Sequence, residues 1–199
     1  MKYQRPWRLR ADFPMLAIPE SKRAMREWAR GARAGGDPVT AGKALTEIVL
    51  RACPPPAGAV VSGFWPMQGE IDIRPLLGAL HAAGHDVVLP VTPKLGHPLT
   101  FRVWHPDEAM VREKFGTFAP SGAVLSPDFL LVPLLAFDRG CFRLGYGGGY
   151  FDRTLPLLPN AFTLGCAFAA QEVPRVPTEA FDVRLDAIAT EGEIIRALT

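Results

Sequence analysis

The stretch LLVPLLAFDRGCFRLGYGGGYFDRTL, residues 130–155, contains the strand and the loop around which we expect the rest of the chain to be organised. Its apolar beginning, residues 130–137, predicts a buried strand that ends at Asp138, and Asp138-Arg139-Gly140 is typical of a turn. Glycines then fill positions 145 and 147–149, and the residues from Tyr150 onward are typical of the start of a helix. The stretch therefore predicts a strand, a glycine-rich loop and a helix in succession.

The glycine-rich loop has the composition of a phosphate-binding loop. Glycines allow backbone N–H groups to approach an anion, and a helix start adds partial positive charge. A plain turn between strand and helix is the alternative, but aromatic residues inside the cluster and Asp152 just after it favour a ligand. The dinucleotide pattern G-x-G-x-x-G fails because Tyr150 stands at its last glycine, and Gly42-Lys43 lacks the flanking residues of a P-loop.

Composition limits the class of protein. A chain of 199 residues, 48% of them hydrophobic, predicts one domain with one core, and a net charge of +2 is too small to indicate a nucleic-acid partner. Three widely spaced cysteines without a C-x-x-C motif favour neither a disulfide framework nor a zinc site. Since no apolar run has the length of a signal sequence or a membrane span, we expect a cytoplasmic monomer that binds small molecules, with no membrane partner.

The order of predicted elements indicates an α/β fold with a mostly parallel central sheet. A strand, a helix and a strand with short connections form the repeating unit of such sheets. We expect an extended arm over residues 1–19 and a single domain over residues 20–199. Helices are predicted over residues 20–34, 38–52, 73–83 and 153–158, and strands over 59–65, 86–91, 99–104, 130–137, 162–168 and 187–190.

Polar and charged residues follow several of these strands. Glu70 comes after the strand that ends at Trp65, the glycine-rich loop follows the strand of residues 130–137, and Asp182 precedes the last strand. Ligands of parallel α/β sheets bind at the carboxyl ends of strands, so these residues are expected to meet there. Lys22 and Arg26 lie four apart on one face of the first helix, where a merely solvated face is the alternative.

Taken in order, these residues resemble the 5-formyltetrahydrofolate cyclo-ligase family, also called methenyltetrahydrofolate synthetase. The resemblance runs from about Ser21 to the C-terminus, and its most specific part is the run from Arg143 to Arg153 with Ala136-Phe137-Asp138 before it. The supporting pieces are Lys22-x-x-Met25-Arg26, Pro66-Met67-Gln68-Gly69-Glu70, Leu89-Pro90, Phe115-Gly116, Pro120, Leu131-Val132-Pro133, Asp182, Asp186 and Thr190-Glu191. The order of the pieces is more specific than any short piece alone.

The resemblance implies a three-layer α/β/α sandwich and an ATP- and Mg²⁺-dependent enzyme. The implied reaction closes 5-formyltetrahydrofolate to 5,10-methenyltetrahydrofolate and releases ADP and phosphate. It proceeds through phosphorylation of the formyl oxygen and attack by N10, so it asks the protein mainly to position the reactants and to neutralise charge.

Site residues follow from the resemblance position by position. Catalytic roles fall on Lys22, Arg143 and Tyr150. The ATP site would comprise Lys22, Arg26, Arg143, Leu144, Gly145, Tyr146, Gly147, Gly148, Gly149, Tyr150 and Phe151. The folate site would comprise Trp65, Glu70, Tyr146, Gly147, Gly148, Gly149 and Tyr150. Asp152 and Asp182 would bind Mg²⁺ as oxygen ligands.

Several alternatives stay open at this point. Trp65 could be a core residue and Asp182 a loop cap. Phe151 stands where the family commonly has a second tyrosine, so no hydroxyl is available there. The chain could also be a family paralogue without the cyclo-ligase activity, a folate- or nucleotide-binding protein without catalysis, or an RNA-associated protein. Glu70 together with the two aspartates favours the folate reaction, and the composition is poorly suited to RNA.

Overall fold

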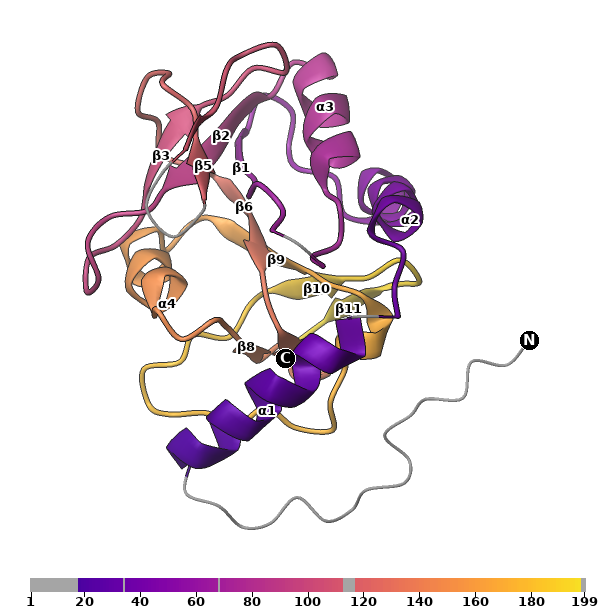
Figure 1. Cartoon of the computed structure of the whole chain (residues 1–199). Helices are drawn as coiled ribbons and strands as arrows, with labels where there is room; N and C mark the ends of the chain where they lie inside the picture. The colour runs from indigo at the N-terminus through magenta and orange to yellow at the C-terminus, as the bar shows by residue number, and fades with distance from the viewer. Residues whose placement is uncertain (1–17, 34, 68, 113–116, 198–199) are drawn as a thin grey trace.

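The computed structural model describes residues 18–33, 35–67, 69–112 and 117–197 (Figure 1). Almost all of the predicted arm, residues 1–19, lies outside this part of the chain, as do Gln68 and the Phe115-Gly116 pair. The helices are α1 (Ile18–Arg33), α2 (Pro38–Ala52), α3 (Arg74–Ala82) and α4 (Tyr150–Thr154), with 3-10 turns η3 (Leu155–Leu157) and η4 (Ala169–Gln171). None of the described helices is long and apolar enough to cross a membrane.

A seven-stranded sheet forms the centre of the molecule, in the order β11-β10-β9-β6-β1-β2-β3. Its strands are β1 (Val60–Ser62), β2 (Asp86–Val91), β3 (Thr100–Val103), β6 (Phe129–Pro133), β9 (Phe162–Cys166), β10 (Ala187–Ala189) and β11 (Ile194–Arg196). The five inner strands are parallel, and the edge strands β3 and β11 are antiparallel to their neighbours. The predicted mostly parallel sheet is therefore confirmed.

Helices cover both faces of this sheet, which confirms the three-layer sandwich. Residues of β6 alternate between two cores: Leu131 packs with α2 and α3, whereas Leu130 and Val132 pack with η3 and α4 on the other face. Figure 1 shows α2 and α3 on one side of the sheet and α4 on the other. A third, smaller core joins Met25 and Ala29 of α1 to a hairpin of β7 (Ala136–Phe137) and β8 (Arg143–Leu144).

The strand predicted over residues 130–137 is wrong at its C-terminal end. The structure divides this run into β6 and β7, which belong to different sheets. The buried Gln171 side chain donates from its Nε2 to the carbonyls of Leu134 and Leu135, at 2.9 and 2.8 Å. A side chain thus satisfies these backbone groups in place of a neighbouring strand, and the chain leaves the large sheet there.

Other predictions agree in position but differ in extent. The expected helix after the glycine-rich loop is α4 followed by η3, because Pro156 has no N–H with which to continue the α-helix. No element was predicted between the strands of residues 99–104 and 130–137, and the structure has a hairpin there, formed by β4 (Val111–Arg112) and β5 (Phe118–Ala119). Strand β11 was not predicted. Asp37 caps α2 by accepting the Val39 N–H at 3.1 Å, and Pro38 occupies the first position of the helix.

Candidate active site

A cavity of about 670 Å³ opens at the carboxyl ends of β1, β2 and β6. It is lined by α1, the loop after β1, the segment from β8 into α4, and the loop of residues 179–182. Every residue expected to bind ATP, folate or Mg²⁺ lines it: Lys22, Arg26, Trp65, Glu70, Arg143, Leu144, Gly145, Tyr146, Gly147, Gly148, Gly149, Tyr150, Phe151, Asp152 and Asp182. Residues up to 160 positions apart in the sequence thus face one space.

The two arginines of the cavity are held by short contacts. Arg26 donates from Nε to the carbonyl of Gly145 at 3.0 Å, which ties α1 to the glycine-rich loop. Arg143 lies on β8 with a side chain only 4% exposed, and it donates to Asp152 Oδ1 at 2.7 Å and to the Val183 carbonyl at 2.5 Å. Burial lowers the pKa of Arg143, and Asp152 counters that effect. Arg143 therefore remains a cation on the cavity wall.

Lys22 is paired with two carboxylates. Its ammonium group donates to Glu179 and to Asp182, both at 2.6 Å, and lies 5.8 Å from the centre of the Phe181 ring. Burial acts against the charged form, but the hydrogen bonds of Asp182 and Glu179 outweigh it and raise the pKa of Lys22. Asp182 also accepts the Glu179 N–H at 2.7 Å, so the loop-capping role left open by the sequence is present as well. Glu179, three residues before Asp182, was not predicted as a site residue.

The carboxylates expected to hold Mg²⁺ each have one oxygen bonded to a cation, Asp152 to Arg143 and Asp182 to Lys22. Over the described ranges, no group of three or more His, Cys, Asp or Glu side chains could hold a metal ion by itself. Magnesium in phosphoryl-transfer sites is usually held by one or two carboxylates together with substrate phosphates and water. The donor set therefore fits an ion that arrives with a nucleotide.

The glycine-rich loop connects β8 directly to α4. Gly147 has φ of 103° and Gly149, the N-cap of α4, has φ of 64°, which are conformations that L side chains rarely adopt. The helix that follows has only five residues, and a macrodipole is the sum over aligned peptide units. The contribution expected from the helix start is therefore small, and the loop backbone and the nearby cations are the groups that could bind an anion here.

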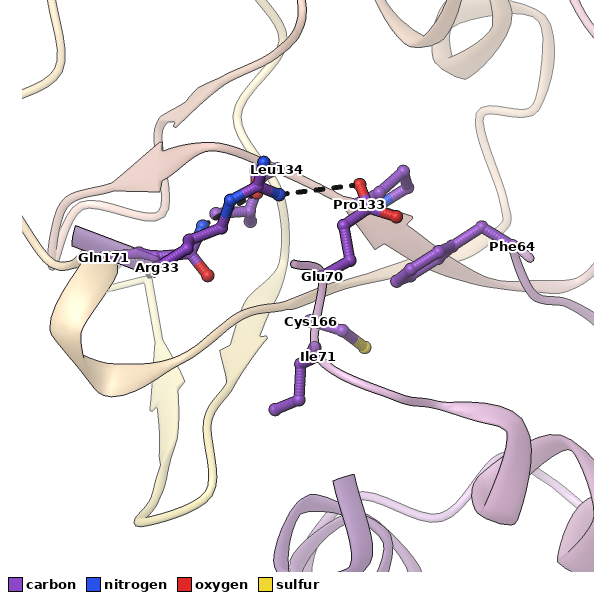
Figure 2. A pocket seen from close by; sticks show the side chains of 8 residues that line it. All are labelled: Arg33, Phe64, Glu70, Ile71, Pro133, Leu134, Cys166 and Gln171. Carbon is purple, nitrogen blue, oxygen red and sulfur yellow. Dashed lines mark hydrogen bonds and ion pairs between the residues drawn. The ribbon is translucent and has the colours of Figure 1, made fainter. Parts of the chain in front are cut away.

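Glu70, Tyr146 and Arg33 form a polar cluster, and the first two of these residues line the cavity. The Tyr146 hydroxyl donates to Glu70 Oε1, the Met67 N–H donates to Glu70 Oε2 at 2.8 Å, and Arg33 donates to the Tyr146 oxygen at 2.7 Å. Figure 2 shows the Arg33 guanidinium and the Glu70 carboxylate facing each other. Arg33 Nη1 lies 3.8 Å from Glu70 Oε1. Burial raises the pKa of Glu70, and its hydrogen bonds and Arg33 act in the opposite direction. Burial and the Glu70 carboxylate also raise the pKa of Tyr146, so the phenol remains a donor.

The aromatic residues of the site have neighbours of their own. Trp65 lines the cavity and also packs against Trp104, with ring centres 6.1 Å apart, and under the Arg74 guanidinium at 5.7 Å. Tyr150 donates to the Pro93 carbonyl at 3.3 Å, and both Tyr150 and Phe151 pack on the core beneath α4. The two readings of Trp65, core residue and cavity wall, therefore both hold.

Sequence reasoning missed the apolar residues at the cavity wall and one buried arginine. Leu95, Phe118 and Phe181 line the cavity with exposed side chains, and no motif or spacing marks them. Met67 also lines the cavity; it lies in the motif that ends at Glu70 but was not predicted as a site residue. Arg33 lies in the last turn of α1 together with Arg30, and nothing in the local sequence distinguishes it from a solvent-exposed basic residue. Its burial against Tyr146 depends on a contact across 113 residues of sequence.

Comparisons with known proteins identify sequence relatives of this chain. A model of the 5-formyltetrahydrofolate cyclo-ligase family matches residues 20–191. The 5-formyltetrahydrofolate cyclo-ligase of Haemophilus influenzae is 37% identical over 131 residues, 61% of this chain and 70% of that protein. The enzyme of the same name from Escherichia coli K12 is 35% identical over 143 residues, 67% of this chain and 79% of that one.

Solved structures share the fold. The NMR structure of Aquifex aeolicus 5,10-methenyltetrahydrofolate synthetase superimposes with a TM-score of 0.72 at 24% identity, covering 89% of this chain and 93% of that one. The corresponding protein of Mycoplasma pneumoniae gives a TM-score of 0.68 at 20% identity, over 85% and 98% of the two chains. At these identities the structural likeness establishes the fold, and the family match establishes the relationship. The chain belongs to the 5-formyltetrahydrofolate cyclo-ligase family.

Proposed function

We propose that this protein converts 5-formyltetrahydrofolate to 5,10-methenyltetrahydrofolate in an ATP- and Mg²⁺-dependent reaction that releases ADP and phosphate. The observation that carries the proposal is the single cavity described above, which unites cations, carboxylates, a glycine-rich loop and a buried glutamate in a member of this family. We further propose that it acts as a cytoplasmic monomer whose domain spans residues 20–199, with residues 1–19 as an arm.

The chemistry requires a poor leaving group to be made a good one. The formyl group on N5 is an amide, and its oxygen takes the γ-phosphoryl group as the bond between that group and ADP breaks. N10 then attacks the formyl carbon, the carbon–oxygen bond to phosphate breaks, and N10 loses its proton. The products are the methenyl compound, ADP and phosphate. Such a reaction depends on alignment and charge neutralisation more than on covalent help from the protein.

The cationic end of the cavity suits the triphosphate. Lys22, Arg26 and Arg143 would contact its phosphate oxygens, and backbone N–H groups of the glycine-rich loop would add uncharged donors. Lys22 would then exchange part of its contact with Glu179 and Asp182 for a phosphate contact. Asp152 and Asp182 would hold Mg²⁺, which would neutralise charge on the transferring phosphoryl group.

The other end of the cavity suits the pterin. Glu70 lies there as an acceptor for ring N–H groups, and Trp65, Tyr146 and Tyr150 supply flat apolar surface beside it. The partly apolar wall also limits water, which strengthens interactions with the developing charge. With the two ligands arranged in this way, the formyl oxygen would lie between the pterin end and the phosphate end.

The test mixes purified protein with 5-formyltetrahydrofolate, Mg²⁺ and ATP, and follows the methenyl product by its ultraviolet absorption together with ADP release. We expect product only when ATP and Mg²⁺ are both present. Asp152→Asn should lower turnover about 100-fold and raise the Mg²⁺ concentration needed, since it removes a charged oxygen ligand. Asp107→Asn, at an exposed turn, is the matched control and should behave as the wild type.

Two results would contradict the proposal. One is the absence of any ATP-dependent product from folded protein, and binding of ATP or folate without turnover would then indicate the non-catalytic paralogue. The other is wild-type turnover and Mg²⁺ dependence in Asp152→Asn, which would show that the metal lies elsewhere.

A further inference from the structure

Arg33 is an unusual residue for the last turn of a surface helix. Its side chain is only 9% exposed, and its guanidinium lies 5.6 Å from the centre of the Tyr146 ring. Within the described part of the chain its Nε is buried and has no hydrogen-bond partner. Burying a cation with one donor unsatisfied costs stability, so packing alone does not account for the residue.

The groups that Arg33 contacts both belong to the site. One is the Tyr146 hydroxyl, 2.7 Å from Nη1, and the other is the Glu70 carboxylate, 3.8 Å from the same nitrogen. The Tyr146 hydroxyl in turn donates to Glu70. Because Arg33 donates to the Tyr146 oxygen, the hydroxyl hydrogen of Tyr146 is directed toward Glu70.

Glu70 has few neighbours that could hold it as an anion. Its side chain is 5% exposed, which disfavours the carboxylate form. The charged and titratable groups that face it are Arg33 from α1, Tyr146 from the glycine-rich loop, and the Cys166 thiol of β9, which lines the same small space (Figure 2). Burial raises the pKa of that thiol, so it brings no charge at neutral pH. Arg33 is thus the one full positive charge among these facing groups.

We propose that Arg33 is a positioning residue for the folate site, which directs the Glu70 carboxyl group and favours its anionic form through its contacts with that group and with Tyr146. The inference rests on the proposed function, because it assumes that Glu70 accepts hydrogen bonds from the pterin. Both oxygens of a carboxylate can accept hydrogen bonds from N–H groups. In a protonated carboxyl group one of these oxygens carries a hydrogen and acts as a donor, so it no longer suits an N–H group. Loss of Arg33 should therefore weaken folate binding while the phosphate end of the cavity stays intact.

The kinetic test compares Arg33→Gln and Arg33→Lys with the matched control Arg30→Gln, an exposed arginine of the same helix. KM and kcat for both substrates are measured between about pH 6 and about pH 9. Arg33→Gln should raise KM for 5-formyltetrahydrofolate about tenfold at neutral pH and change KM for ATP by less than about twofold. Arg33→Lys should restore most of the loss, and Arg30→Gln should match the wild type.

The pH dependence has a defined sign. Arg33 stabilises the Glu70 anion, so its removal raises the pKa of Glu70, and the acidic limb of kcat/KM for folate should move to higher pH by about one pH unit. The defect of Arg33→Gln should accordingly be largest at acidic pH and shrink toward alkaline pH. A residue needed only for folding would give a loss that does not follow the titration of one group.

A measurement that needs no turnover separates this inference from the proposed function. Carbon NMR of protein labelled at the glutamate carboxyl groups, with Glu70→Gln to assign the signal, reports the titration of Glu70 directly. We expect a higher pKa for Glu70 in Arg33→Gln than in the wild type. If Arg33→Gln does not fold, Arg33→Met is used in its place, because methionine retains the apolar part of the arginine side chain and removes the charge.

An unchanged Glu70 titration in Arg33→Gln, or in Arg33→Met where that variant is used instead, overturns the inference, whether or not the wild type is active. So does an unchanged KM and pH profile for folate in an active enzyme. If the wild type makes no product while the Glu70 titration shifts as expected, the proposed function fails and the electrostatic role of Arg33 stands.

Discussion

Replacement of Gly42 by alanine should test the packing that positions the segment carrying Glu70. Gly42 is buried on α2, and a Cβ atom there would lie 1.9 Å from the carbonyl oxygen of Asp72 and 2.8 Å from its carbonyl carbon. The Asp72 N–H also donates to the Pro38 carbonyl at 3.1 Å, so this segment rests directly on α2. Gly78 on α3 is the matched control, because a Cβ there meets nothing within 4 Å.

Both substitutions increase helix propensity, but only Gly42→Ala creates a steric clash. Alanine is more favourable than glycine inside a helix by about 0.5–1 kcal/mol, so Gly78→Ala should stabilise the protein by roughly that amount. Gly42→Ala has the same gain, but α2 must move away from a backbone carbonyl, and overpacking of this kind costs about 1–3 kcal/mol or more. Since backbone cannot rotate aside as a side chain can, we take the upper end and expect a net loss of about 2 kcal/mol.

Thermal unfolding and folate kinetics provide the assay. For a chain of this size, about 2 kcal/mol corresponds to a fall in Tm of roughly 4–8 °C, whereas Gly78→Ala should raise Tm by a few degrees. Displacement of the segment should also raise KM for 5-formyltetrahydrofolate more than KM for ATP, because Glu70 lies two residues before Asp72. A Tm for Gly42→Ala at or above that of the wild type would show that the reasoning from this contact is incorrect.

Two further predictions concern the phosphate end of the cavity. Lys22→Met should raise KM for ATP about tenfold, and it should lower the free energy of unfolding, since Glu179 and Asp182 lose their shared cation. Because the pKa of Lys22 is raised in the folded state, this stabilisation is present at neutral pH and is lost as the pH rises through the folded-state pKa. Urea unfolding of the wild type and of Lys22→Met should therefore show a difference in unfolding free energy at neutral pH that shrinks above about pH 10. In Gly149→Ala the alanine must adopt φ near 64°, and its Cβ would lie 2.7 Å from Arg153 Nη1. We therefore expect the free energy of unfolding to fall by about 1–2 kcal/mol and ATP to bind more weakly in isothermal titration calorimetry. An ATP affinity equal to that of the wild type would contradict the proposed role of the loop.

Local patterns were enough to predict the framework of this protein. Strand β2 has the bounds that its apolar run indicated, and α2 begins at Pro38 because Asp37 supplies a cap within two residues. The glycine-rich loop was recognisable because positive φ angles, found at Gly147 and Gly149, restrict the choice of residue type. Hydrophobic period, caps and glycine conformations are all properties of a few neighbouring residues, so they can be read without the fold.

Prediction failed at two places for different reasons. The run of residues 130–137 is apolar throughout, and it is divided into two strands where the buried Gln171, 36 and 37 positions away, binds the carbonyls of Leu135 and Leu134. Propensity cannot predict this division, because the deciding partner for the backbone lies outside any local window. Edge strand β11 pairs with β10 across a short return of the chain, and it was missed because its sequence carries no clear alternation.

By itself the sequence determined the α/β class, the order of the main elements and the residue types that the proposed phosphate, metal and pterin contacts require. Only the tertiary structure decided their pairings: Lys22 with Glu179 and Asp182, Arg143 with Asp152, and Arg33 behind Tyr146 and Glu70. The physical reason is that an ion pair or a buried hydrogen bond depends on distance and burial, which the folded chain sets both for residues 157 positions apart, such as Lys22 and Glu179, and for residues nine positions apart, such as Arg143 and Asp152. A motif can name the charge at a position, but the fold sets which partner it meets and how far water is excluded.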